Sequence, residues 1–161
     1  MKKKANNPTV LDRTDRRILE CLQADGRISN VQLARKVNLT PTPCIERVKR
    51  LERQGYIRGY TALLDPELVD ASLLVFVEID LSHKSPDAFR NFREEARHLP
   101  EIMDCHLVSG NFDYLIKARV KDMKAYRRLL GDKILSLPGV SGSRSYVVME
   151  EVKETLSLAL F

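Results

Sequence analysis

The sequence predicts an α+β protein with two domains, a small helical domain followed by a domain built on an antiparallel sheet. Three observations lead to this prediction. Helical periodicity with helix caps dominates residues 11–55, and alternation of apolar and polar side chains begins near residue 73. Between them, the acidic and proline-containing stretch DPELVDAS at residues 65–72 interrupts both patterns. A chain of 161 residues is long enough for two small domains.

Charge divides the chain at the same place. The net charge is +5, but residues 1–64 hold 14 Lys or Arg against 6 Asp or Glu, a balance of +8, and residues 65–161 hold 13 against 16, a balance of −3. A polyanion would therefore bind the amino-terminal half. The expected divisions are a disordered basic arm at 1–10, a helical domain at 11–64, a linker at 65–72, a sheet domain at 73–153 and a tail at 154–161.

The first two helices are marked by their caps. Asp12, with Asp15 three residues later, begins a helix that ends before Gly26. Ser29 and Gln32 form a capping box for a second, short helix. The side chains of this second helix that we expect to be buried are Val31, Leu33, Ala34 and Val37.

A third helix follows after about three residues, which indicates a steep crossing of the kind found in helix-turn-helix motifs. Asn38 can adopt the left-handed conformation in the turn, Thr40 caps the helix, Pro41 occupies its first position, and Gly55 ends it. At 100° per residue the buried stripe is Cys44, Ile45, Val48 and Leu51. The opposite face carries Pro43, Glu46, Arg47 and Arg50. Residues 56–64, YIRGYTALL, then predict a short ribbon that turns at Arg58-Gly59, as a wing.

The second domain alternates strands and helices in the order βαββαβ, which is a ferredoxin-like arrangement. Its expected strands are residues 73–81, 102–108, 112–120 and 143–152. Ser85-Pro86 caps the first helix and Asp122 caps the second. The inward side chains we expect on the two helices are Phe89, Phe92, Ala96 and Leu99, and Met123, Tyr126, Leu130 and Ile134. A weak repeat, LPEI at 99–102 and LPGV at 137–140, supports two βαβ halves.

Several protein classes are disfavoured. Cys21, Cys44 and Cys105 lie far apart without CxxC spacing, as expected of reduced cysteines in a cytoplasmic protein. No apolar run approaches the roughly 18 residues that cross a membrane, and MKKKANNPT lacks the apolar stretch of a signal peptide. Asp104, Cys105 and His106 are neighbours on one strand, so their side chains diverge. The three histidines lack metal spacing, and no Gly-rich phosphate loop occurs, so neither an enzyme, a metal site nor a cofactor is expected.

Seven segments carry a resemblance to a known family: LDRTDRRIL, DGRISNVQLARKV, LTPTPCIERVKRLERQGYI, GYTALLDP, ASLLVFVEI, CHLVSGNFDYL and LPGV. Over residues 11 to about 153 the chain resembles the Lrp/AsnC family of bacterial transcription regulators. The resemblance implies a winged helix-turn-helix domain joined by a hinge to a ferredoxin-like domain of the RAM type, which oligomerises and binds an amino acid between subunits. Two features depart from the family pattern: Asn38, where glycine is common, and the apolar tail TLSLALF.

The third helix becomes a recognition helix when the preceding helix and the resemblance are taken together. Its candidates for base edges in the major groove are Thr42, Pro43, Glu46 and Arg47, and Arg50 would meet an edge or a phosphate. Arg27, Ser29 and Asn30 are candidates for the phosphate backbone. The alternative for the third helix is a solvated basic face, and for Ser29 and Asn30 it is simple helix capping.

The turn SGNFD at 109–113 is the second candidate site. Spacing alone favours a hairpin turn at Gly110-Asn111. The resemblance implies a role in the effector pocket, where backbone N–H groups of Ser109, Gly110 and Asn111 would hold a carboxylate and Asp113 would pair with an ammonium. The other lining residues expected are Leu107, Val108, Met123, Tyr146, Val147 and Val148.

The function we predict is transcription regulation that responds to an amino acid, with leucine expected, and that controls genes of amino-acid metabolism. The partners would be double-stranded DNA, the effector and further copies of the chain, as a homodimer that assembles to an octamer; no membrane is expected. We expect the protein in the bacterial cytoplasm, associated with the nucleoid. Two alternatives belong to other classes: an architectural nucleoid protein without an effector, and an amino-acid sensor acting on a protein partner, which the +8 balance disfavours.

Overall fold

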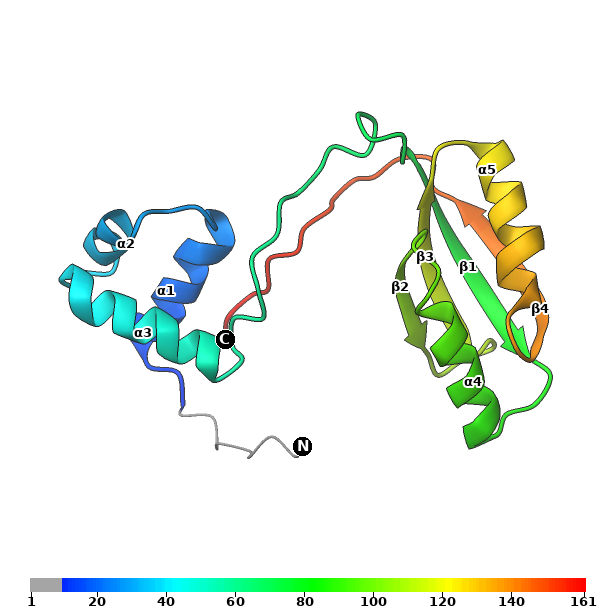
Figure 1. The fold of residues 1–161 in the computed structure, drawn as a ribbon, viewed down its shortest axis with the longest axis horizontal. Coiled ribbons are helices and arrows are strands. Elements are labelled where there is room, and N and C mark those ends of the chain that lie inside the picture. The colour runs from blue at the N-terminus through cyan, green and yellow to red at the C-terminus, as the bar shows by residue number, and fades with distance from the viewer. Residues whose placement is uncertain (1–9) are drawn as a thin grey trace. The chain divides into compact units, whose positions relative to one another are not determined.

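A computed structural model describes residues 10–161, so the predicted basic arm lies almost wholly outside the described residues. The chain forms two compact units. The first contains the residues up to Leu63 and takes in Glu154–Phe161, and the second is Leu64–Lys153. The chain therefore passes between the units twice, and residues 154–161 belong with the helical unit (Figure 1).

Three helices make up most of the first unit: α1 Arg13–Ala24, α2 Asn30–Lys36 and α3 Pro41–Arg53. The predicted cap at Asp12 and the predicted capping box at Ser29 are both confirmed: the Asp12 carboxylate accepts from the Asp15 N–H at 2.7 Å, and the Ser29 hydroxyl accepts from the Gln32 N–H at 3.2 Å. Apolar faces of the three helices meet in one core. Its buried members are Ile18, Leu19, Leu33, Ala34, Val37, Cys44 and Leu51.

Left-handed residues bracket α3 as the sequence predicts. Asn38 in the turn before it has φ 57°, and Gly55 behind it has φ 81°. Thr40 stands at the N-cap position, but its side chain makes no capping bond among the described residues. Pro41 occupies the first helical position, where its missing N–H costs nothing.

Two expectations for the first unit are wrong. Val31 is 48% exposed. On an α-helix it stands about 160° from Leu33, on the far side from the core. Within the described residues 56–64, no paired strand forms where a ribbon was expected. An isolated two-stranded ribbon without an apolar surface to cover is marginal. Instead, Tyr56 and Ile57 pack on the helical core, and the Tyr60 hydroxyl donates to Glu52 at 3.0 Å.

The second unit has the predicted βαββαβ order. Its main elements are β1 Leu73–Leu81, α4 Pro86–Ala96, β2 Ile102–Leu107, β3 Tyr114–Val120, α5 Met123–Arg128 and β4 Val140–Val147. The strands pair antiparallel in the order β2-β3-β1-β4, and both helices cover the same face of the sheet (Figure 1). The strand order and the shared face together are the ferredoxin-like arrangement.

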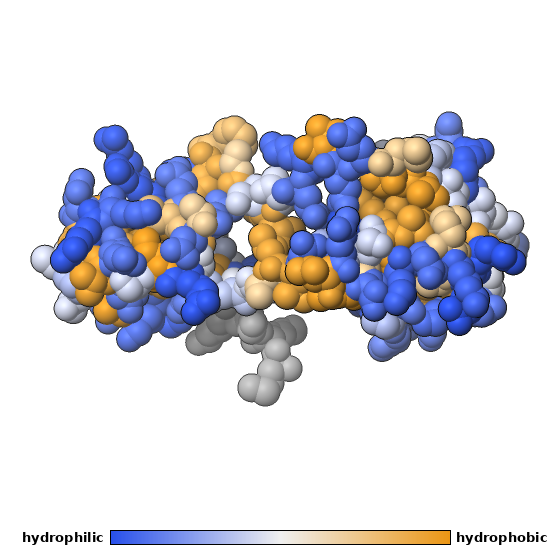
Figure 2. All heavy atoms as spheres, turned by 90° about the horizontal axis from the view of Figure 1, so that it is seen from above, coloured by the Kyte–Doolittle hydropathy of each residue, from blue (hydrophilic) through white to orange (hydrophobic). Residues whose placement is uncertain are grey.

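Alternate residues of the central strands build the core of this unit. Val75, Val77 and Ile79 of β1 face the helices together with Ile116 and Ala118 of β3, and all five are fully buried. The outer strands are different, since most residues of β2 and β4 are exposed. Exposed apolar side chains also follow the segments that connect the units (Figure 2).

The second helix of this unit departs from its prediction. After Arg128 the α-helix becomes a π-helical turn, Leu129–Lys133, and then a 3₁₀ turn, Ile134–Ser136. The π turn shifts the helical phase, so Leu129 lies in the core in addition to Ile134, and Leu130 is only partly buried. Met123 was expected to face inward but is 49% exposed. The strand limits also differ, because β3 begins at Tyr114 and β4 ends at Val147.

Candidate functional site

The amino-terminal part of α3 presents an exposed polar face. Thr42, Pro43 and Glu46 are exposed there, whereas Cys44 and Leu51 on the opposite side are buried against α1 and α2. The hydrophobic stripe thus holds the helix down and leaves these three candidates for base contacts accessible.

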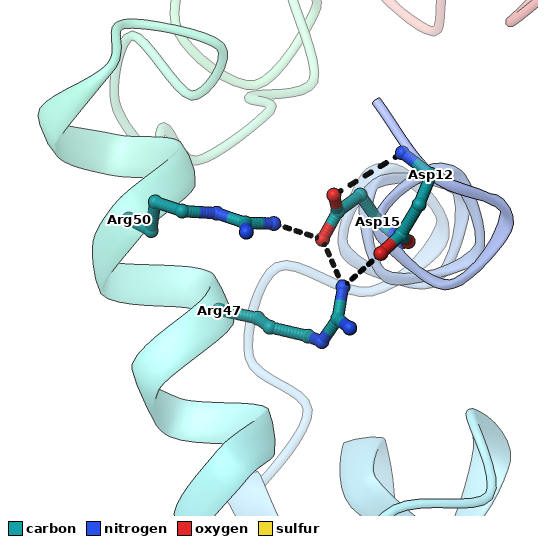
Figure 3. A network of polar contacts seen from close by, with 4 residues as sticks. All are labelled: Asp12, Asp15, Arg47 and Arg50. Atoms are coloured by element: carbon teal, nitrogen blue, oxygen red, sulfur yellow. Dashed lines mark hydrogen bonds and ion pairs between the residues drawn. The ribbon is translucent and has the colours of Figure 1, made fainter. Parts of the chain in front are cut away.

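The two arginines of this face are held by α1 (Figure 3). Arg47 Nη1 lies 2.5 Å from Asp12 Oδ2 and 2.8 Å from Asp15 Oδ1, and Arg50 Nη2 lies 2.5 Å from the same Asp15 oxygen. The Asp15 side chain is 3% exposed, while those of Arg47 and Arg50 are 30% and 32% exposed. The sequence predicts that both arginines lie on the face opposite the core; in the structure each reaches across to the buried Asp15 carboxylate of α1 (Figure 3).

This cluster is electrically balanced, with two carboxylates and two guanidinium groups. The hydrogen bond from Arg47 lowers the pKa of Asp12, and the same contact raises the pKa of Arg47. Buried Nε of Arg50 has no hydrogen-bond partner among residues 10–161. Asp15 therefore has two roles, in the α1 cap and as the shared partner of two cations. The sequence pattern of Asp12 followed by Asp15 predicts only the role in the cap.

The predicted phosphate contacts lie at the start of α2. Arg27 and Asn30 are exposed. The Ser29 hydroxyl is occupied by the capping box, since it accepts from the Gln32 N–H and lies 3.1 Å from Gln32 Oε1. Capping, the alternative from sequence, is therefore what the Ser29 side chain does in this structure.

In the second unit, SGNFD is the hairpin turn between β2 and β3. The Val108 N–H donates to the Asp113 carbonyl at 3.0 Å, and the Asp113 N–H donates to the Ile79 carbonyl at 2.9 Å. Ser109, Gly110 and Asn111 are exposed at its tip. The turn is therefore tied to the end of the central strand β1 and leaves its tip open.

Asp113 is buried at the base of this turn. Its Oδ2 accepts from the Leu81 N–H at 2.9 Å, and its Oδ1 lies 3.0 Å from the Lys84 ammonium. Burial by itself raises the pKa of Asp113, but the Leu81 N–H and Lys84 outweigh it, so this pKa lies below its ordinary value. Sequence reasoning predicted an ammonium beside Asp113 but missed Lys84. The only signal was its position in the SHKSP loop directly after β1.

The remaining effector candidates lie at the other end of the sheet. The turn adjoins Ile79 of β1, whereas Val147 of β4 pairs with Val75, four residues or about 13 Å along the strand. Met123 follows β3 at that second end, because Val120 pairs with Leu73. One chain thus forms two groups: a turn group of Leu107, Val108, Ser109, Gly110, Asn111 and Asp113, and a far group of Met123, Tyr146, Val147 and Val148.

A cleft of about 320 Å³ opens between α4 and β2. Its apolar lining includes Ile102, Met103, Leu107 and Tyr114. Arg93 of α4 and Arg97, the residue that follows this helix, also line it. Of the predicted effector residues only Leu107 lines it. Within the described part of the chain, no group of His, Cys, Asp or Glu side chains is arranged to hold a metal ion. No helix of residues 10–161 is long and apolar enough to cross a membrane.

Two family models match the chain. A winged helix-turn-helix DNA-binding model covers residues 11–58, and the Lrp/AsnC ligand binding domain covers residues 74–158. The proteins named leucine-responsive regulatory protein in Escherichia coli strain K12 and in Klebsiella pneumoniae are each 63% identical over 150 residues, which is 93% of this chain and 92% of each relative.

Solved structures agree with these matches. A transcriptional regulator of Neisseria meningitidis, determined as a complex with L-Met, is 41% identical, with a TM-score of 0.88 over 92% of this chain and 96% of its own. An AsnC family regulator of Agrobacterium tumefaciens is 36% identical, also with a TM-score of 0.88, over 92% and 97% of the two chains. These relatives are named as regulators, which confirms the prediction that the chain is not an enzyme. The chain belongs to the Lrp/AsnC family of transcription regulators, with a winged helix-turn-helix DNA-binding domain followed by the family's ligand-binding domain.

Proposed function

We propose that the chain is a sequence-specific regulator of genes of amino-acid metabolism whose binding to double-stranded DNA, in the cytoplasm and at the nucleoid, responds to free leucine. The observation that supports leucine most directly is 63% identity to proteins named leucine-responsive regulatory protein. A structural neighbour solved with L-Met supports an amino acid as the class of effector.

DNA contact is assigned to the exposed face of α3. Thr42, Pro43 and Glu46 meet base edges, because they are exposed on the amino-terminal part of that helix. Arg47 and Arg50 are paired with carboxylates that neutralise their positive charge. DNA must therefore compete with Asp15 for the two arginines. The competition favours DNA sites where a base edge or phosphate offers the arginines better geometry than the aspartates do. It therefore adds selectivity rather than affinity. Arg27 and Asn30 contact the phosphate backbone from the start of α2.

The effector site is assigned to the space between subunits. The turn group and the far group lie at opposite ends of one sheet, so a single chain cannot close both around one small molecule. A second chain can bring its far group to the turn group of the first. There the exposed N–H groups of the turn bind the effector carboxylate and Asp113 binds its ammonium, displacing Lys84.

Assembly follows from the outer strands of the sheet. Exposed apolar side chains there include Met103 and Leu107 on β2 and Tyr146 and Val147 on β4. Apolar side chains on edge strands mark surfaces that associate. We assign these surfaces to a homodimer that assembles further, to an octamer.

The testing experiment measures DNA affinity and sedimentation of the full chain with and without about millimolar leucine, a concentration in the range where small-molecule sites of this kind respond. Leucine is expected to change one or both, and Asp and Lys at equal concentration are expected to change neither, because the lining residues are largely aliphatic. Sequence-specific DNA binding that no amino acid alters would contradict the proposal and favour the architectural alternative.

A further inference from the structure

The apolar tail that sets this sequence apart packs on the first unit. Gln23 near the end of α1 makes two hydrogen bonds to the main chain of Leu158: its Nε2 donates to the Leu158 carbonyl at 3.0 Å, and its Oε1 accepts from the Leu158 N–H at 2.6 Å. Arg16 also donates to the main-chain oxygen of Phe161. Arg16 and Gln23 are seven residues apart on α1, about 20° from one another around the helix, so they form one face.

The pattern of contacts is one of backbone recognition with a single apolar anchor. A glutamine amide that pairs with both the N–H and the C=O of one residue imitates the neighbouring strand of a sheet. Leu160 packs against the core of the helical unit. The side chains of Leu156 and Leu158 stay exposed. Leu160 is therefore the tail side chain that the helical unit recognises. The two hydrogen bonds between Gln23 and Leu158 fix the position of the tail along α1.

We propose that the α1 face formed by Arg16 and Gln23 is a binding surface for the chain's own residues 155–161. The tail of the same chain occupies this face in the structure: the chain returns to the first unit at residue 154, and Leu160 packs against the helical core. Because the tail is covalently attached, its effective concentration is high, and three hydrogen bonds with one apolar anchor suffice to keep it bound. The tail thus serves as a second tether of the DNA-binding unit, independent of the 64–72 connection.

Native-state hydrogen exchange of the full chain tests this directly. The Leu158 amide is expected to be protected in the wild type. Gln23→Ala is expected to reduce that protection on the order of tenfold, because two hydrogen bonds are lost. Gln23→Glu keeps the acceptor for the N–H but loses the donor to the carbonyl, so it is expected to fall between the two. Leu160→Ala is expected to lower the protection as well.

Leu156→Ala is the matched control, since this side chain of the same tail is 69% exposed and should leave protection unchanged. An unprotected Leu158 amide in the wild type, or protection that Gln23→Ala leaves intact, would overturn the proposal. A second measurement identifies the occupant. The pair Gln23→Cys and Leu158→Cys, in a Cys105→Ser background, is expected to form a disulfide within one chain. A disulfide-linked dimer would assign the surface to the tail of another copy, and the proposal for this chain's own tail would fail.

Discussion

Each unit contains one buried aspartate that meets cations at the candidate ligand surface, and the two are used in opposite ways. In the first unit Asp15 is the support, and the arginines it holds are the groups that reach the ligand. In the second unit Asp113 is itself the group proposed to bind the effector, and the exposed Lys84 is paired with it in the structure. Loss of Asp15 should therefore disturb the scaffold first, whereas loss of Asp113 should disturb effector binding first.

The largest effect is expected from Asp113→Ala. An effector ammonium that loses its buried counter-charge costs about 2 to 5 kcal/mol of binding free energy, so the leucine response should disappear. DNA affinity without leucine should remain nearly unchanged, because Asp113 belongs to the other unit. Titration of DNA with and without leucine measures both quantities. An unchanged leucine affinity in the variant would place the pocket elsewhere, with the α4–β2 cleft as the next candidate.

Asp15→Ala should mainly destabilise. Removing one partner from a fully buried ion pair costs about 3 to 5 kcal/mol; we expect about 2 to 3 here because both arginines keep contact with water. Urea unfolding measures the loss. Asp12→Asn is the control, because asparagine keeps an oxygen that can accept from the Asp15 N–H, and the half-exposed Asp12 carboxylate pairs with only one arginine, Arg47. Its loss should therefore be much smaller. Equal losses in the two variants would remove the distinction between support and surface charge.

Arg47→Ala tests the same cluster of aspartates and arginines by its effect on DNA binding. If Arg47 meets a base edge, the change should cost about 1 to 3 kcal/mol of specific binding and relax preference at one base position. Affinity for a set of single-base operator variants measures this, and the salt dependence serves as the control. A uniform loss over all sequences with a shallower salt slope would make Arg47 a phosphate contact instead.

The elements that were predicted correctly have local signals. The cap at Asp12, the capping box at Ser29, the left-handed Asn38 and the alternation along β1 each depend on residues within a few positions of one another. The same holds for the SGNFD hairpin, whose ends close on themselves. Periodicity and turn chemistry specify such features before any tertiary contact forms.

What the sequence did not reveal depends on distant partners. Arg47 and Arg50 pair with Asp15, which is more than thirty residues away in the sequence. No local pattern distinguishes such a paired face from a solvated basic face. Gln23 meets the tail across most of the chain. The π turn at Leu129–Lys133 changed which leucine enters the core, because a phase shift inside a helix leaves no composition signal.

A smaller effect is expected from Lys84→Met, which frees one oxygen of Asp113. Lys84 is mostly exposed, so its ion pair contributes little to stability. Removing a competing ammonium should keep the leucine response and tighten leucine binding by a few fold, on the order of the strength of a surface pair. Calorimetric titration of leucine measures this. A lost response would make Lys84 a member of the site rather than a substitute for the effector.

The smallest expected effect is on the pH dependence of stability, which should distinguish Asp12 of the first unit from Asp113 of the second. The pKa values of Asp12 and Asp113 both lie below the ordinary value of 3.8, so each carboxylate stabilises the fold above that pH and loses its contribution as the pH falls through its lower folded-state pKa. The main stabilising contact differs, being the Arg47 guanidinium for the half-exposed Asp12 and the Leu81 N–H for the buried Asp113. Salt screens an exposed ion pair but hardly affects a buried hydrogen bond to the backbone. The unfolding free energy of the wild type, Asp12→Asn and Asp113→Asn should therefore be compared between about pH 2 and 6 at about 0.05 and 0.5 M salt. The pH-dependent difference due to Asp12 should shrink in high salt, and the one due to Asp113 should persist. If both shrink together, the Lys84 ion pair rather than the backbone bond holds Asp113, and the contrast between the two aspartates would be one of degree.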